Sequence, residues 1–267
     1  MNSNVLVWLV VLCSSPGNAI IRTEYRIPLP FTLDECRIGH LWSTAQWAIL
    51  NSDAEGGVEI VENEPSEFGR YTFKIFRADS KIPNTIRLLA PKGSLFFMEK
   101  SWNDFPQVKT EVGSPYMKET FHIKTFSRYV EADDCQQDNI FDGIYSGSRT
   151  VIPVDIVNDK INPKEYREDE DPSKCHRGKL NVNPDWKTSE VRVCVYKLVE
   201  LEFVWHDINS VEGLIQKAAT QYFRQLHRQM FCWADKWIDL SMKDIRAFEY
   251  KVQQDLMKKR SQGEVMG

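Results

Sequence analysis

Apolar residues in the last third of the chain recur three or four positions apart, which is the spacing of one face of an α-helix. The positions that share this face are Tyr222, Leu226, Met230, Trp233 and Trp237. Residues 239–241 interrupt the period. A second helix is predicted over residues 242–260, with Ser241 and Asp244 placed as its capping box. Its inward positions are Ile245, Phe248, Val252 and Leu256.

One carboxylate falls on the inward face of this second helix. Glu249 lies four residues after Ile245 and three before Val252, so it points the same way as both. A buried carboxylate without a partner is costly, so Glu249 needs a cation or hydrogen-bond donors. The periodicity leaves two interpretations open: a structural salt bridge, or a residue that closes over a polar ligand.

Upstream of these helices, apolar and polar residues alternate with the two-residue period of β-strands. Strands are predicted at 24–30, 58–61, 71–76, 94–100, 121–129, 151–157 and 191–205. Thr32 and Glu35 form a capping box for a helix that reaches about Leu50. Strands first and long helices last predict an α+β fold, in which helices pack on a largely antiparallel sheet.

Two of the predicted strands carry a lysine that stands out from its neighbours. Thr72 and Lys74 share one face of their strand, which lies either in solvent or along a cavity. Lys197 interrupts an otherwise apolar face of the strand at 191–205. Together with Glu249, these residues suggest a polar site at one end of an apolar interior.

Composition and charge narrow the class of protein. The chain has 267 residues, 42% of them hydrophobic, and a net charge of −4. No shift in composition divides the chain, so we predict a single domain over residues 20–267. Basic residues are balanced by acidic ones and form no basic run, so no nucleic-acid partner is expected.

The sequence lacks the motifs of the common enzyme and cofactor sites. It contains no GxSxG, HExxH, Walker or kinase signature and no Cys/His cluster with zinc spacing. We therefore expect neither catalysis nor a cofactor. His227, on the predicted long helix, is expected to have a structural or surface role. The six cysteines are scattered without a CxxC pair, which favours unpaired thiols in a reducing compartment.

Residues 1–19 form an apolar leader. A continuous apolar run from Val5 to Cys13 is followed by small residues at Gly17 and Ala19, as in a signal peptide, but a basic n-region is missing. The run is too short to span a membrane. A signal peptide, an alternative start and a peripheral anchor all fit. The expected location is therefore the cytoplasm with transient membrane association, or the secretory pathway if the leader is functional.

From about Glu24 to Arg260 the chain resembles the phosphatidylinositol transfer protein family. The segments that carry the resemblance occur in the family's order: EYRIPLP, GVEIVENEP, YTFKIF, SKIP, RLLAPKG, EKSWNDFP, YMKE, EDEDP, YKLVELEF and HRQMFCWADKWIDLSMKDIR. The resemblance implies a START-like, or helix-grip, domain. Such a domain has a concave, largely antiparallel sheet that encloses a lipid cavity closed by long α-helices.

The family's lipid-contacting positions can be carried over to this sequence. Its inositol-binding pattern falls on Thr72, Lys74, Glu99, Asn103 and Glu249. Its phosphate-binding positions resemble Thr110, Ser127, Lys197 and, on the first helix, His40. A membrane-docking aromatic falls on Trp205. Three of these positions are the polar residues that the periodicity singles out independently.

The sequence also departs from the family pattern near the headgroup and at the membrane. His40 stands where the family has Gln, and Val108 where it has Cys, which bears on phosphate geometry and on the handling of choline lipids. Trp205 is followed by His206 in place of a second aromatic, which predicts weaker or pH-sensitive docking. A loop is shortened at residues 175–178.

The resemblance implies a monomeric carrier rather than an enzyme. It would bind one phospholipid, preferentially phosphatidylinositol, and transfer it between membranes through transient contact with their surfaces. The second lipid is phosphatidylcholine or phosphatidic acid. The alternative is a lipid-dependent sensing or interaction protein with little transfer activity. We also expect the final helix to act as a lid that moves on membrane contact.

Overall fold

A computed structural model describes residues 20–78, 93–145, 147–161, 163, 166–175, 186–203 and 211–266. The strands are β1 (Ile21–Leu29), β2 (Gly57–Ser66), β3 (Gly69–Arg77), β4 (Phe96–Asp104), β5 (Gln107–Gly113), β6 (Phe121–Glu131), β7 (Thr150–Pro153) and β8 (Val193–Phe203). The α-helices are α1 (Leu33–Leu50), α3 (Trp186–Ser189), α4 (Val211–Cys232), α5 (Ala234–Trp237) and α6 (Met242–Met266), with 3₁₀ turns η3 (Lys118–Thr120) and η4 (Glu168–Glu170).

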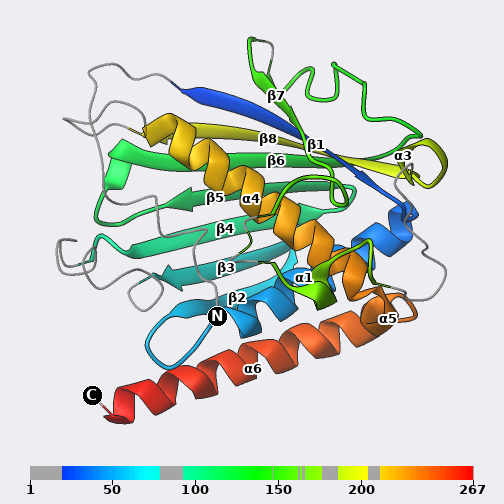
Figure 1. Cartoon of the computed structure of the whole chain (residues 1–267). Coiled ribbons are helices and arrows are strands. Elements are labelled where there is room, and N and C mark those ends of the chain that lie inside the picture. The colour runs from blue at the N-terminus through cyan, green and yellow to red at the C-terminus, as the bar shows by residue number, and fades with distance from the viewer. Residues whose placement is uncertain are drawn as a thin grey trace.

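The strands form one mixed, open sheet in the order β2-β3-β4-β5-β6-β8-β1-β7. Each neighbouring pair is antiparallel except β1 and β7, which run parallel. Helix α4 crosses one face of the sheet, α1 lies on the same side, and α6 runs along the edge next to β2 (Figure 1). The α+β class and the largely antiparallel sheet expected from the sequence are confirmed.

The main core lies between the helices and the face of the sheet that they cover, which we call the inner face. Strand β1 contributes Tyr25, Ile27 and Leu29, each at most 1% exposed, to a cluster that includes Phe231 and Trp237. A smaller cluster joins α1, β2 and α6 through Ala48, Ile60, Val252 and Leu256. The inward positions predicted for the two C-terminal helices therefore do face the interior.

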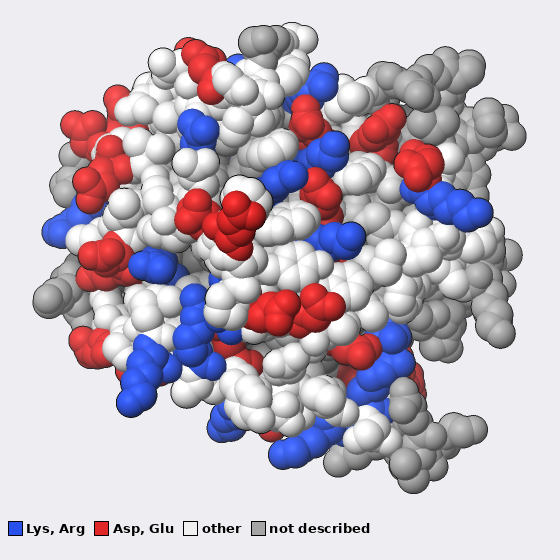
Figure 2. All heavy atoms as spheres, turned by 180° about the vertical axis from the view of Figure 1, so that it is seen from behind, with Lys and Arg blue, Asp and Glu red and all other residues white. Residues whose placement is uncertain are grey.

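The outer face of the sheet carries charges of alternating sign. The strand register places Lys100 opposite Glu111, Glu111 opposite Lys124, and Lys124 opposite Glu200. Glu200 in turn forms an ion pair with Arg22, whose Nε lies 2.7 Å from Glu200 Oε1. Opposite charges on directly paired residues stabilise a sheet modestly. Viewed from behind, basic and acidic side chains are interspersed over the surface rather than gathered by sign (Figure 2).

Both helix starts predicted from capping boxes are confirmed. At α1, the Glu35 amide donates to Thr32 Oγ1 at 3.3 Å and the Thr32 amide donates to Glu35 Oε2 at 2.8 Å. At α6, Ser241 and Asp244 exchange the corresponding bonds at 2.9 and 3.3 Å. Helix α4 begins at Val211, eleven residues before Tyr222, the first position predicted on its face, and it ends at Cys232. Trp233 separates it from α5.

The expectation of unpaired cysteines is wrong for four of the cysteines in the described ranges. Cys135 is bonded to Cys194 and Cys175 to Cys232, with Cα atoms 5.5 and 5.4 Å apart. The partners are 59 and 57 residues apart in sequence, so their pairing leaves no local spacing signal. Cys36 is free, and burial raises the pKa of its thiol.

In the part of the chain that the structure describes, no helix has the length and apolar character needed to cross a bilayer. The leader, residues 1–19, lies outside the described residues, as do Trp205 and His206.

Candidate functional site

The residues predicted to bind lipid come together on the inner face of the sheet. Directly paired residues on neighbouring strands point to the same face, so the register assigns them to rows. The first row is Lys74 and Glu99, the second Thr72, Ser101, Thr110 and Thr125, and the third Arg70, Asn103, Val108, Ser127, Lys197 and Tyr25. The rows are adjacent, because their members are two residues apart along each strand.

The first row is an ion pair across two strands. Lys74 Nζ donates to Glu99 Oε1 at 2.8 Å, and the side chains remain 23% and 18% exposed. Both groups are therefore accessible to a ligand on the inner face while each partly neutralises the other. The structure confirms that Lys74 is half-buried rather than projecting into bulk solvent.

The second row consists of hydroxyls. Ser101 Oγ lies 3.1 Å from Thr110 Oγ1, and each hydroxyl can donate or accept a hydrogen bond. Thr72 and Thr125 flank this pair in the neighbouring strands. A run of hydroxyls suits a ligand that itself carries hydroxyl or phosphate oxygens.

The third row contains a buried cation. Lys197 is 5% exposed, and its Nζ donates to Ser127 Oγ at 3.0 Å. The ammonium lies 5.4 Å from the centroid of the Phe223 ring and 6.0 Å from that of Tyr129. Burial lowers the pKa of Lys197 to about 8. Among the described residues, no carboxylate forms an ion pair with this ammonium, so its charge is balanced by no fixed anion.

Two histidines on the covering helices face Lys197. His40 of α1 packs edge-on against Tyr129, with ring centroids 5.8 Å apart. Burial, and next the charge of Lys197, hold its pKa well below the usual value. The same two causes lower the pKa of His227 on α4 to about 3, and its Nδ1 lies 2.6 Å from the Phe223 carbonyl. Both imidazoles are therefore neutral at pH 7 and can serve a ligand as hydrogen-bonding groups.

Glu249 approaches the same face from α6. Its side chain is 12% exposed, accepts a 2.5 Å bond from Arg246 Nη1, and lies 4.0 Å from Arg70 Nε. Arg70 is the register partner of Asn103, which places Glu249 beside the third row. The salt bridge that periodicity allowed is therefore present, and the ligand interpretation stays a prediction.

Alternation within one strand identifies only part of this site. Ser101, Thr125, Arg70 and His227 belong to it but were not among the predicted residues. Each of the three strand residues pairs across the sheet with a predicted position, so the missing information was the register, which a single sequence does not contain. Val108, which stands where a family Cys was expected, fills the third row between Asn103 and Ser127 and belongs to the core.

An open sheet with helices over one face and a polar patch inside it is the architecture of START-like lipid-binding proteins. The family model described as phosphatidylinositol transfer protein matches residues 20–254. The chain belongs to this family.

Individual relatives agree over most of the chain. It is 37% identical to the mouse phosphatidylinositol transfer protein beta isoform over 93% of its own length and 97% of the relative's. It is 37% identical to phosphatidylinositol transfer protein 1 of Dictyostelium discoideum, over 88% of this chain and 94% of that one. It is 36% identical to the mouse membrane-associated phosphatidylinositol transfer protein 1, over 85% of this chain and 19% of that longer protein.

Proposed function

We propose that the protein binds one phospholipid, preferentially phosphatidylinositol, and transfers it between membranes without chemical change. The observation that carries this proposal is Lys197. Its ammonium is buried beside a hydroxyl and two neutral imidazoles, with no carboxylate partner among the described residues. A phosphodiester supplies the missing anion and accepts hydrogen bonds from the ammonium and from Ser127.

The neighbouring rows suit the inositol ring. Its hydroxyls both donate and accept, and so require partners of both kinds. The carboxylates of Glu99 and Glu249 accept hydrogen bonds, the ammonium of Lys74 donates, and Asn103 and Thr72 do both. A choline headgroup offers no hydroxyl to these groups, which is why we rank phosphatidylinositol first. The second lipid, phosphatidylcholine or phosphatidic acid, would use the phosphate contacts alone.

The acyl chains explain why a carrier needs a cover that opens. Two chains hold on the order of thirty methylenes, and at about 0.8 kcal/mol each, exposing them to water would cost roughly 25 kcal/mol. Opening against a bilayer avoids this cost, because lipid replaces protein around the chains. Helix α6 is the candidate cover, since it holds Glu249 over the headgroup rows.

Contacts of α6 define what must break on opening. Phe248 stacks on Trp42 of α1, with ring centroids 5.4 Å apart, and Lys259 Nζ donates to the carbonyls of Ile49 and Ser52. We expect phospholipid vesicles to speed amide hydrogen exchange in α6 and leave α4 unchanged. Equal acceleration in both helices, or none in α6, would contradict a moving cover.

The direct test is mass spectrometry of lipids extracted from the purified protein, followed by a vesicle transfer assay. Phosphatidylinositol at about one molecule per chain and its exchange between vesicles are expected. Bound lipid without exchange would favour the alternative of a monomeric lipid sensor that contacts membranes without transfer. A protein that contains no lipid and takes none up from vesicles would overturn the proposal.

The disulfides bear on the cellular compartment in which the protein works. Disulfides persist in oxidising compartments and are rare in the cytosol. We keep the cytoplasm with transient membrane association as the first proposal, and the two disulfides are the reason to test the secretory pathway as the alternative. Peptide mapping of protein from its native cells, with thiols blocked before lysis, distinguishes the two. Free thiols at these four cysteines would support the cytoplasm, whereas both disulfides and a chain that starts near residue 20 would support the secretory pathway instead.

A further inference from the structure

A second group of cations lies outside the headgroup rows. It lines a pocket of about 290 Å³ between α4 and the segment that carries η4. The charged residues of the wall are Arg167, Lys217, Arg224, Arg228 and Glu170. Among the described residues, the pocket shares no lining residue with the three rows. Its three arginines are each paired with a carboxylate, Arg167 with Asp169 and Glu170, Arg224 with Asp159 and Arg228 with Asp171, and Lys217 is the lining cation without an ion pair to a described residue.

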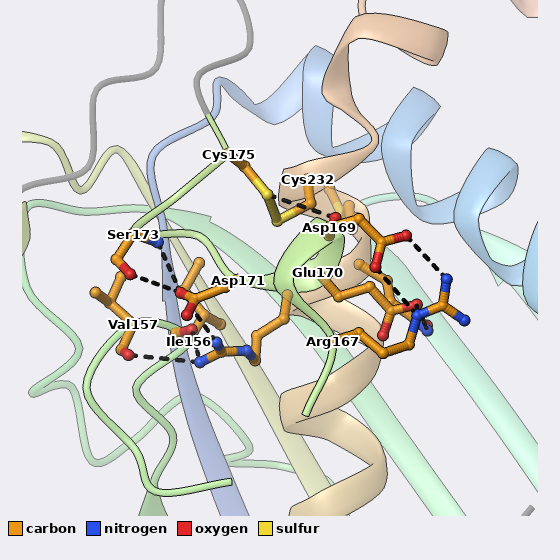
Figure 3. Close-up of a disulfide and its surroundings, with 12 residues drawn as sticks. Ile156, Val157, Arg167, Asp169, Glu170, Asp171, Ser173, Cys175 and Cys232 are labelled. Atoms are coloured by element: carbon orange, nitrogen blue, oxygen red, sulfur yellow. Dashed lines mark hydrogen bonds and ion pairs between the residues drawn. A yellow bond between two sulfur atoms is a disulfide. The ribbon is translucent and has the colours of Figure 1, made fainter. Parts of the chain in front are cut away.

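Two of these arginines donate hydrogen bonds to neighbouring residues from one edge of the guanidinium group. Arg224 donates Nε to Asp159 at 3.0 Å and Nη1 to the Lys160 carbonyl at 2.8 Å. Arg167 donates Nε and Nη2 to Asp169 at 3.1 and 2.8 Å (Figure 3). A guanidinium has five N–H donors in a fixed plane. Within the described residues, Nη2 of Arg224 and Nη1 of Arg167 therefore remain without an acceptor.

Arg228 is the most buried member of the wall. It is 3% exposed, its Nη1 donates to the Ile156 carbonyl at 2.6 Å, and its Nη2 lies 3.4 Å from Asp171. Its buried Nε has no hydrogen-bond partner among the described residues. A buried donor without an acceptor is costly, so the guanidinium of Arg228 retains hydrogen-bonding capacity that no described residue uses. At the other end of the wall, exposed Lys217 forms no ion pair with a described residue.

The two walls of the pocket are fastened together. Cys175, which follows the η4 segment, is bonded to Cys232 at the end of α4 (Figure 3). Gln229 Nε2 of α4 also donates to Glu170 Oε1 at 3.0 Å. The cations contributed by the two segments are thus held in fixed relative positions before any ligand arrives, which lowers the entropic cost of binding.

We propose that this pocket is a second anion site, which binds a phosphate group. A pocket lined, within the described residues, by an unpaired lysine and by arginines that keep unused N–H donors matches the several acceptor oxygens of a phosphate. The site uses Arg224 and Arg228 of α4, whereas Phe223 and His227 of the same helix lie by Lys197, and it does not depend on the proposed cargo. A free phosphorylated molecule and the headgroup of an anionic lipid offer the same chemistry.

The test measures binding of inorganic phosphate to the full-length protein by calorimetry at constant ionic strength. Lys217→Gln is expected to weaken binding about tenfold, the effect of losing one charged hydrogen bond, and Lys217→Arg to restore it. Lys251→Gln removes the same charge from an exposed position on α6 and should change nothing. Unchanged thermal midpoint and lipid content would establish that Lys217→Gln is folded.

Vesicles distinguish the two sources of phosphate. If wild-type protein binds vesicles containing phosphatidic acid, and both free phosphate and Lys217→Gln weaken this binding, the ligand is a lipid headgroup. If vesicle binding is indifferent to both while phosphate binding still depends on Lys217, the ligand is a free phosphorylated molecule. No binding of phosphate, or equal weakening by Lys217→Gln and Lys251→Gln, would overturn the site, whatever the lipid content.

Discussion

A lysine buried without a carboxylate partner makes ligand binding depend on pH. The pKa of Lys197 is about 8 in the ligand-free protein, against about 10.4 for an unperturbed lysine. Below pH 8 the charged form is present and destabilises the fold; this destabilisation is relieved as pH rises from 8 towards 10.4. A bound phosphate favours the charged form, so its affinity changes in the opposite direction.

We therefore expect phosphatidylinositol affinity to be constant below pH 8 and to fall about tenfold per pH unit above it. The fall should stop at the higher pKa that Lys197 has beside a bound phosphate. Equilibrium binding of a fluorescent phosphatidylinositol between pH 7 and 10 measures this. Lys197→Met should bind more weakly throughout and lose the slope. The same slope in both proteins would contradict an origin in Lys197.

Lys74 and Glu249 test whether the headgroup rows select the lipid. Lys74→Ala removes the donor opposite Glu99, and Glu249→Ala removes the carboxylate beside Arg70. Each should reduce phosphatidylinositol transfer about tenfold, the loss of one charged hydrogen bond, with little effect on phosphatidylcholine transfer. Vesicle assays with the two labelled lipids compare them directly. Equal losses for both lipids would mean that these residues only maintain the fold.

At the level of elements, α1 approaches α4 and α5 through a glycine. A Cβ at Gly39 would lie 2.6 Å from Met230 Cε and 2.8 Å from the Trp237 ring. Gly39→Ala should therefore lower stability by about 1–3 kcal/mol, the usual cost of overpacking a core. Urea unfolding measures the change. Gly113→Ala is the matched control, because a Cβ there meets no atom within 4 Å. Equal midpoints for the two variants would disprove the contact.

Local patterns identified the elements better than their connections. Capping boxes located the starts of α1 and α6, because they depend on residues three apart. Strand β5 was not predicted, although Val108, Thr110 and Val112 alternate with charged residues in it, because the run is short and only two of its seven residues are large and apolar. A turn at Phe105 and Pro106 joins it to β4, and the two strands pair in antiparallel fashion from Asp104 and Gln107 onward.

The same limit explains the polar site. Lys197 and Glu249 were visible because each interrupts an apolar period, whereas Ser101 and Thr125 interrupt nothing and were missed. The two disulfides were missed because each joins segments that only the folded chain brings together. Periodicity describes the face of one element, and a binding site is made from the faces of several.

At the scale of the whole molecule, the disulfides attach the long irregular segments to the core. Cys175→Ser with Cys232→Ser frees a loop of 57 residues and should lower the free energy of unfolding by roughly 2–4 kcal/mol. Urea unfolding under non-reducing conditions measures this change. A reductant should lower the unfolding midpoint of the wild type, but should hardly change that of the variant that also lacks Cys135 and Cys194. An unchanged midpoint in the double variant would mean that the segment is held without the bond.

The alternating charges on the back of the sheet affect how the molecule meets a membrane. Neighbouring opposite charges cancel at a distance, and salt at physiological strength screens what remains beyond about 8 Å. The ladder from Lys100 to Arg22 therefore exerts little long-range force on an anionic bilayer. This face of the sheet therefore gives the molecule no preferred orientation towards a charged surface, and any electrostatic orientation has to come from its other faces.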